Sequence, residues 1–178
     1  MKKILSFLYE KLASRKIAYI FGLLYLINQA IIYSILSQLG HDALKLQLTF
    51  SSQVFAGILA KWGDAGLKIY LSHFYFDFHH VILYSVCLAS GIAVLTHRKV
   101  RAPSSFTLFA FFLPFLAAKL DVLENILHLI MIFHRAYLTP TMVAVSGIAT
   151  NVKWFLAFVS VLLVFYFSVQ NVWVRFKK

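Results

Sequence analysis

Four long apolar runs constrain the fold of this chain more than any other feature. A helix that crosses a bilayer needs about 20 mostly apolar residues. The chain is 61% hydrophobic and only 13% charged, against about 45–50% and about 25% in soluble domains. We therefore predict an all-α, four-helix transmembrane bundle, and we exclude a soluble enzyme, a disordered tail and a nucleic-acid-binding module. The predicted spans cover residues 17–39, 69–95, 106–133 and 141–167.

Basic residues beside these runs predict the orientation in the membrane. Lys and Arg total 17 against 6 Asp and Glu, and positive residues favour the cytoplasmic side. Most of them fall before span one, between spans two and three, and after span four, which predicts that both termini are cytoplasmic. These residues are Lys2, Lys3, Lys11, Arg15, Lys16, Arg98, Lys99, Arg101, Arg175, Lys177 and Lys178.

Two segments outside the spans have amphipathic helical patterns. Residues 1–16 place Ile4, Leu5, Leu8 and Leu12 on one helical face, which predicts an interfacial helix ahead of a single membrane domain over residues 17–178. The first loop, residues 40–68, contains a helical apolar stripe over residues 51–62. We expect this segment to end at Gly63 and Gly66 and to lie on the outer face of the membrane as an interfacial or re-entrant helix. Aromatic residues near the span ends predict a membrane-interface belt: Trp62, Tyr70, Tyr137 and Trp173.

Polar residues inside the spans are the candidate functional residues. Carboxylates in hydrocarbon are costly and usually face protein or water, and residues at helical spacing share one face. Because helices that follow a short loop run antiparallel, Glu124 should lie level with both Lys153 and Asp77. The predicted faces are His73, Asp77, His80 and Tyr84 on span two, Asp121, Glu124, Asn125 and His128 on span three, and Ser146, Thr150, Lys153, Ala157 and Ser160 on span four, with Asn28 midway along span one.

This layer predicts a polar pocket inside the bundle. We expect Lys153 to pair with Glu124 or Asp121, because a lone buried ammonium would lose its proton. The favoured function is binding of a lipid or small amphiphile, and in a catalytic version its transformation by general acid–base chemistry. The predicted catalytic residues are Glu124, Asp121 and His80. The predicted ligand-binding residues are Asp77, His73, Tyr84, Asn125, His128, Lys153, Trp154 and Asn28.

Three alternatives remain open at this point. The polar network could only fix the packing of the helices. The chain could be a component of a proton-coupled small-molecule transporter, for which a homo-oligomer would give more room than one bundle. It could also hold zinc or iron on Asp77, His80, Glu124 and His128, although the favoured prediction has no cofactor and no metal. The expected partners are the lipid bilayer and a lipid-like ligand, with no nucleic acid.

Two short motifs carry a resemblance to known membrane proteins. Asp121-Val-Leu-Glu124-Asn125 and Thr150-Asn-Val-Lys153-Trp154 resemble the D-x-x-E-N and T-x-x-K-W motifs of small bacterial four-helix membrane proteins. This likeness implies a bacterial inner (plasma) membrane and implies that the positions act as a set, and it supplies no substrate. In addition, His73-x-x-x-Asp77, Glu124 and Asn151-x-x-Trp154 resemble, with a shift of one helix, elements of the sterol-isomerase and sigma-2-receptor-like membrane proteins. Those proteins form helical pockets.

Overall fold

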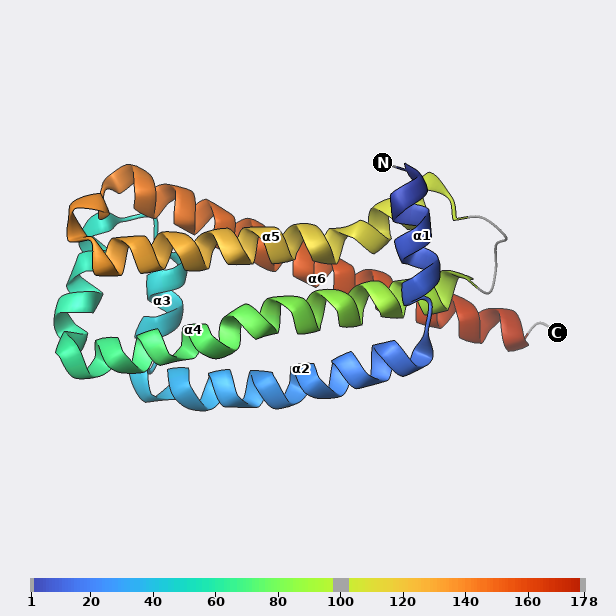
Figure 1. Ribbon diagram of the computed structural model, residues 1–178, viewed down its shortest axis with the longest axis horizontal. Coiled ribbons are helices and arrows are strands. Elements are labelled where there is room, and N and C mark those ends of the chain that lie inside the picture. The colour runs from blue at the N-terminus through green and yellow to red at the C-terminus, as the bar shows by residue number, and fades with distance from the viewer. Residues whose placement is uncertain (1, 98–102, 177–178) are drawn as a thin grey trace. The chain divides into compact units, whose positions relative to one another are not determined.

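The computed structural model describes residues 2–97 and 103–176 of the chain (Figure 1). Over these residues it is all-helical and contains no strand, which confirms the all-α part of the predicted fold class. The predicted cytoplasmic residues Arg98, Lys99, Arg101, Lys177 and Lys178 lie outside the described residues. The elements are α1 (Lys2–Leu12), α2 (Arg15–Leu36), η1 (Ser37–Leu39), α3 (Asp42–Leu48), α4 (Ser52–His97), α5 (Ser105–Phe133), η2 (Arg135–Tyr137) and α6 (Pro140–Phe176).

Four helical segments within the described ranges are long and apolar enough to cross a membrane. They cover Arg15–Leu39, Ser52–His97, Ser105–Phe133 and Pro140–Trp173, so each predicted span falls within one of them. The helices extend beyond the predicted spans chiefly in α4 and α6. The sequence gives no reason for either helix to stop where its apolar run stops, because helical backbone hydrogen bonds continue as readily through polar residues.

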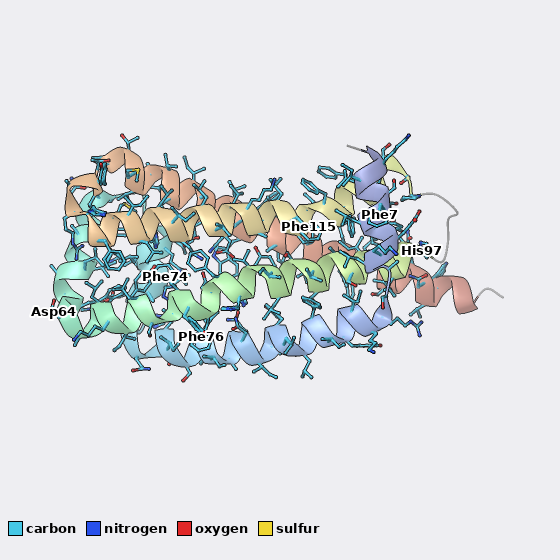
Figure 2. All side chains as sticks on the ribbon, viewed as in Figure 1. Phe7, Asp64, Phe74, Phe76, His97 and Phe115 are labelled. Atoms are coloured by element: carbon cyan, nitrogen blue, oxygen red, sulfur yellow. The ribbon has the colours of Figure 1, made fainter. Side chains whose placement is uncertain are left out.

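Helix α4 bends at Gly63. This residue has φ 55° and ψ −162°, a conformation that glycine adopts without the steric cost of a Cβ. The amphipathic helix predicted for residues 51–62 therefore forms and ends at Gly63, as expected. The prediction that a loop continues to residue 68 was wrong, because the helix resumes directly after the bend. Figures 1 and 2 show the sharp turn in the ribbon, with the exposed Asp64 on its outer side.

The chain divides into two compact units. Unit 1 comprises Met1–Tyr25, Ile82–Ala118 and Phe155–Lys178, and unit 2 comprises Leu26–Val81 and Lys119–Trp154. The divisions fall inside α2, α4, α5 and α6, so each of these helices contributes one part to each unit.

Unit 1 has a core built around α1. Tyr9 of α1 packs with Ala89 and Ile92 of α4 and with Phe111 of α5, and Figure 1 shows α1 running across α4 here. The Tyr9 hydroxyl lies 2.8 Å from Thr96 Oγ1. Thr96 Oγ1 itself donates to the Ile92 carbonyl, so Tyr9 is the donor to Thr96. Partial burial raises the pKa of Tyr9 above its usual value of 10, which keeps this donor protonated.

Unit 2 has a core that includes the first loop. Leu46 of α3 and Phe55 of α4 are fully buried, and they pack with Phe74 of α4, Met131 of α5 and Val143 of α6. Figure 2 labels Phe74 within this part of α4. The apolar stripe predicted for residues 51–62 therefore packs against the other helices of unit 2.

Candidate functional site

Lys153 of α6 lies at the centre of the candidate site in unit 2. Its Nζ is 2.6 Å from Asp121 Oδ1 and 2.5 Å from Glu124 Oε2, and both carboxylates belong to α5. The contact with Asp121 is a directed hydrogen bond. That with Glu124 is a close charge–charge contact without hydrogen-bond geometry. All three side chains are buried. The predicted pairing of Lys153 is therefore confirmed, with both acids instead of one.

Helical spacing explains why one lysine reaches two acids. Asp121 and Glu124 are three residues apart and lie on the same face of α5. Thr150 lies one turn before Lys153 on α6, and its hydroxyl donates to the Ser146 carbonyl at 3.0 Å. Ser146 and Thr150 are fully buried, and such small residues allow close approach between helices. Ser146, Thr150 and Lys153, which belong to the polar face predicted for span four, are therefore buried within unit 2.

A second carboxylate group joins α4 to α5. Asn125 Nδ2 donates to Asp77 Oδ2 at 2.6 Å. Asn125 is 1% exposed, and Asp77 is half-buried. Because Asn125 directly follows Glu124, the two acid groups are adjacent along α5. Asp77 of α4 thus contacts Asn125, the residue that follows Glu124 on α5. The sequence predicts Asp77 and Glu124 at one level.

The predicted histidines fall into different environments. His128 Nδ1 lies 2.8 Å from the hydroxyl of Tyr70, and both side chains are fully buried. His73 Nδ1 contacts the Tyr70 carbonyl, which can only accept a hydrogen bond. His73 Nδ1 must therefore carry a proton, and in the neutral ring Nε2 is left as an acceptor. His80 Nδ1 lies 3.4 Å from Asn28 Nδ2, which also donates to the Phe76 carbonyl.

Several buried polar atoms of this site have no hydrogen-bond partner within the described residues. They include His73 Nε2, Asn125 Oδ1 and Ser146 Oγ. Buried polar groups in folded proteins are nearly always hydrogen-bonded, and an unsatisfied one costs about 1–3 kcal/mol. The site therefore has unused hydrogen-bonding capacity beside its charges.

Two predicted ligand-binding residues differ from the others, Trp154 in its exposure and Tyr84 in the unit to which it belongs. Trp154 is 54% exposed, although its ring centroid is 5.9 Å from Lys153 Nζ. Because consecutive helical residues point about 100° apart, Trp154 is exposed where Lys153 is buried, and its role in lining the pocket stays a prediction. Tyr84 is buried, but it belongs to unit 1, whereas every other predicted site residue belongs to unit 2.

Tyr70 is the residue that the sequence interpretation misplaced. It is predicted as part of an interfacial belt, yet it is 0% exposed and contacts both His73 and His128. Its spacing from His73 and Asp77, three and seven residues, places it on the same helical face. That periodicity is the signal that would have identified it. Phe55 was also missed, and its ring packs edge-on against His128 with centroids 5.2 Å apart.

Within the described residues the acid groups form no candidate metal cluster, and they do not line the surface hollow of unit 2. Across residues 2–97 and 103–176, no group of three or more His, Cys, Asp or Glu side chains is arranged to hold a metal ion. A surface hollow of about 440 Å³ lies elsewhere in unit 2, and none of its lining residues is a predicted site residue. It is lined by Ala56, Leu59, Ala60, Arg135 and Leu138.

The site thus holds three buried charges, on Asp121, Glu124 and Lys153, beside the half-buried Asp77. One ammonium is shared by two carboxylates, a third carboxylate is held by an amide, and neighbouring acceptors are unfilled. No family model, curated protein or solved structure matches the chain.

Proposed function

We propose that this chain is a multi-pass membrane protein whose helices enclose a polar site for a lipid-like or small amphiphilic molecule. The four apolar helical segments support the membrane location by their length and composition. In this proposal both termini face the cytoplasm, α1 lies at the membrane surface, and the helices of unit 2 surround the polar site.

One observation carries the proposal. Asp77, Asp121 and Glu124 supply three carboxylates, and Lys153 supplies one ammonium, within helices that are long and apolar enough to cross a membrane. A network that only fixed helix packing would be expected to balance its charges and fill its hydrogen bonds. This one does neither, since buried acceptors remain unfilled. A ligand with a polar head would supply what is missing, and its apolar part would lie among the surrounding Phe and Leu side chains.

A component of a proton-coupled transporter is the second candidate. Asp77, Asn125 and Glu124 form a short row of proton-exchanging and hydrogen-bonding groups, and such rows mark relays in other membrane proteins. Flux that depends on a pH gradient in proteoliposomes, and that is lost in Asp77→Asn, would favour this function over simple binding.

Native mass spectrometry of the protein released from lipid nanodiscs tests the proposed binding function. We expect a stoichiometric co-purified lipid or small amphiphile in the wild-type chain. It should be lost or strongly depleted when Asp121→Asn, Glu124→Gln and Lys153→Met are combined. The control is His79→Gln, because His79 is a polar side chain of unit 2 that is exposed on α4, outside the Lys153 group. A correctly folded wild-type protein that retains no bound molecule, and that is stabilised by none when amphiphiles are added, would contradict the proposal.

A further inference from the structure

We propose that the ligand head held at Asp77 is a primary ammonium group. This inference rests on the proposed function and names the chemical class of the head. It starts from the charge of unit 2, in which Lys153 already engages Asp121 and Glu124 at 2.6 and 2.5 Å. Asp77 is not part of that pairing. It accepts a hydrogen bond from a neutral amide, Asn125 Nδ2, and no ion pair joins it to a cation within the described residues, so a cationic head would balance its negative charge.

The unfilled atoms around Asp77 are hydrogen-bond acceptors. Asn125 Oδ1 belongs to the same amide that donates to Asp77, so it lies beside that carboxylate. His73 precedes Asp77 by one helical turn on the same face of α4. Its Nδ1 is used by the Tyr70 carbonyl, so Nε2 of the neutral ring accepts. The side chains of Asn125 and His73 are 1% and 0% exposed, so bulk water does not fill these acceptors.

A primary ammonium fits this set better than other cations do. It carries three N–H donors, and the set offers a carboxylate oxygen, an amide oxygen and an imidazole nitrogen. A quaternary ammonium has no donor and would leave both buried acceptors unfilled. Alkali and alkaline-earth ions prefer oxygen ligands, and so they would make poor use of His73 Nε2. Lys153, a primary ammonium itself, shows that unit 2 binds this group through short contacts to carboxylates.

The head-group series that tests this inference needs no mutation. The wild-type protein in nanodiscs is titrated with dodecylamine, dodecyltrimethylammonium or dodecanol, compared at equal mole fraction in the membrane. Binding is followed by the thermal unfolding midpoint and by native mass spectrometry. We expect dodecylamine to bind at least tenfold more tightly than the other two, because charge-assisted hydrogen bonds to buried acceptors are among the strong ones. Equal binding of dodecylamine and dodecyltrimethylammonium would overturn the inference.

Matched variants then locate the head. Asp77→Asn should weaken dodecylamine binding at least tenfold and leave dodecanol binding unchanged, whereas the exposed-residue control His79→Gln should change neither. Dodecylamine binding that survives Asp77→Asn would also overturn the inference. A co-purified amphiphile without an amine, lost on neutralising the Lys153 group, would overturn the ammonium head and keep the proposed function. Absence of binding by any of the probes, together with no co-purified molecule, would remove both.

Discussion

The two units of this chain bury different kinds of polar group. In unit 1 the buried polar side chains are hydroxyls: Ser85, Ser90, Thr96, Thr107 and Ser160. Most of them donate to nearby backbone carbonyls, as Ser90 does to Leu12 at 2.6 Å. In unit 2 the buried set includes the ion-paired Asp121, Glu124 and Lys153. All the buried atoms without a hydrogen-bond partner in the described residues also belong to unit 2.

This difference shows what the apolar helices need for packing alone. Unit 1 joins α1 to α4 through neutral hydroxyl groups that fill their own hydrogen bonds, and α5 packs there through apolar contacts. Charges are therefore not required to hold helices of this composition together. Because buried ion pairs lose much of their attraction to desolvation, the charged groups of unit 2 are poor devices for stability, which is why we assign them a ligand.

The largest expected effect separates the two units directly. Lys153→Met removes the ammonium that lies between Asp121 and Glu124 and takes this counter-charge away from two buried carboxylates. Breaking a buried pair in this way costs about 3–5 kcal/mol. We expect the free energy of unfolding in mixed micelles to fall by that amount.

The matched control removes the whole charge set. With Asp121→Asn and Glu124→Gln added to Lys153→Met, most of the lost stability should return, because no unpaired charge remains. A triple variant as unstable as Lys153→Met alone would mean that side-chain shape, and not charge, explains the loss.

The next effect concerns the hydrogen bond between Tyr70 and His128. Tyr70→Phe removes the hydroxyl 2.8 Å from His128 Nδ1 and keeps the ring. Since His128 is 1% exposed, its nitrogen would be left unsatisfied. The free energy of unfolding should fall by about 1–3 kcal/mol. A loss below about 0.5 kcal/mol would indicate that this bond is not formed in the membrane-embedded protein.

The sequence was sufficient for the helices and for the pairing of Lys153. Apolar runs of 23 to 28 residues and the helical spacing of the polar residues can be recognised without knowledge of the tertiary structure. Asp121 and Glu124, three residues apart, had to share a face, and the short turn before α6 had to bring Lys153 near them. These features follow from helix geometry and the cost of charge in hydrocarbon.

The sequence was insufficient where packing decides the outcome. Tyr70 has the composition and position of an interfacial aromatic residue, and only its contacts with His73 and His128 reveal that it is buried. Trp154 has the composition of a pocket residue, but its rotation on α6 exposes it. The bend at Gly63 was predictable as a helix end, whereas the immediate restart of α4 depends on backbone geometry that no residue pattern marks.

A smaller effect is expected in unit 1. Tyr9→Phe removes the donor to Thr96 Oγ1 and keeps the aromatic packing against Phe111. The Thr96 hydroxyl still donates to the Ile92 carbonyl, so no buried donor is left unsatisfied, and the loss should be about 0.5–1.5 kcal/mol. Unfolding of Tyr9→Phe measured beside Tyr70→Phe compares the same atom change in both units. A larger loss for Tyr9→Phe would reverse the contrast drawn between them.

The smallest effect is expected for an ion pair of unit 2 that is not buried. Lys61 Nζ lies 2.6 Å from Asp42 Oδ2, as close as Lys153 lies to Asp121, but the Lys61 side chain is 71% exposed. Exposed pairs contribute about 0–1 kcal/mol and are screened by salt, so Asp42→Asn should lower stability by less than about 1 kcal/mol. The difference from wild type should vanish in about 1 M salt, where the Debye length is about 3 Å, whereas the loss in Lys153→Met should persist. If both losses vanished in salt, solvent ions would have to reach Lys153, and the charged site of unit 2 would be open to water instead of enclosed.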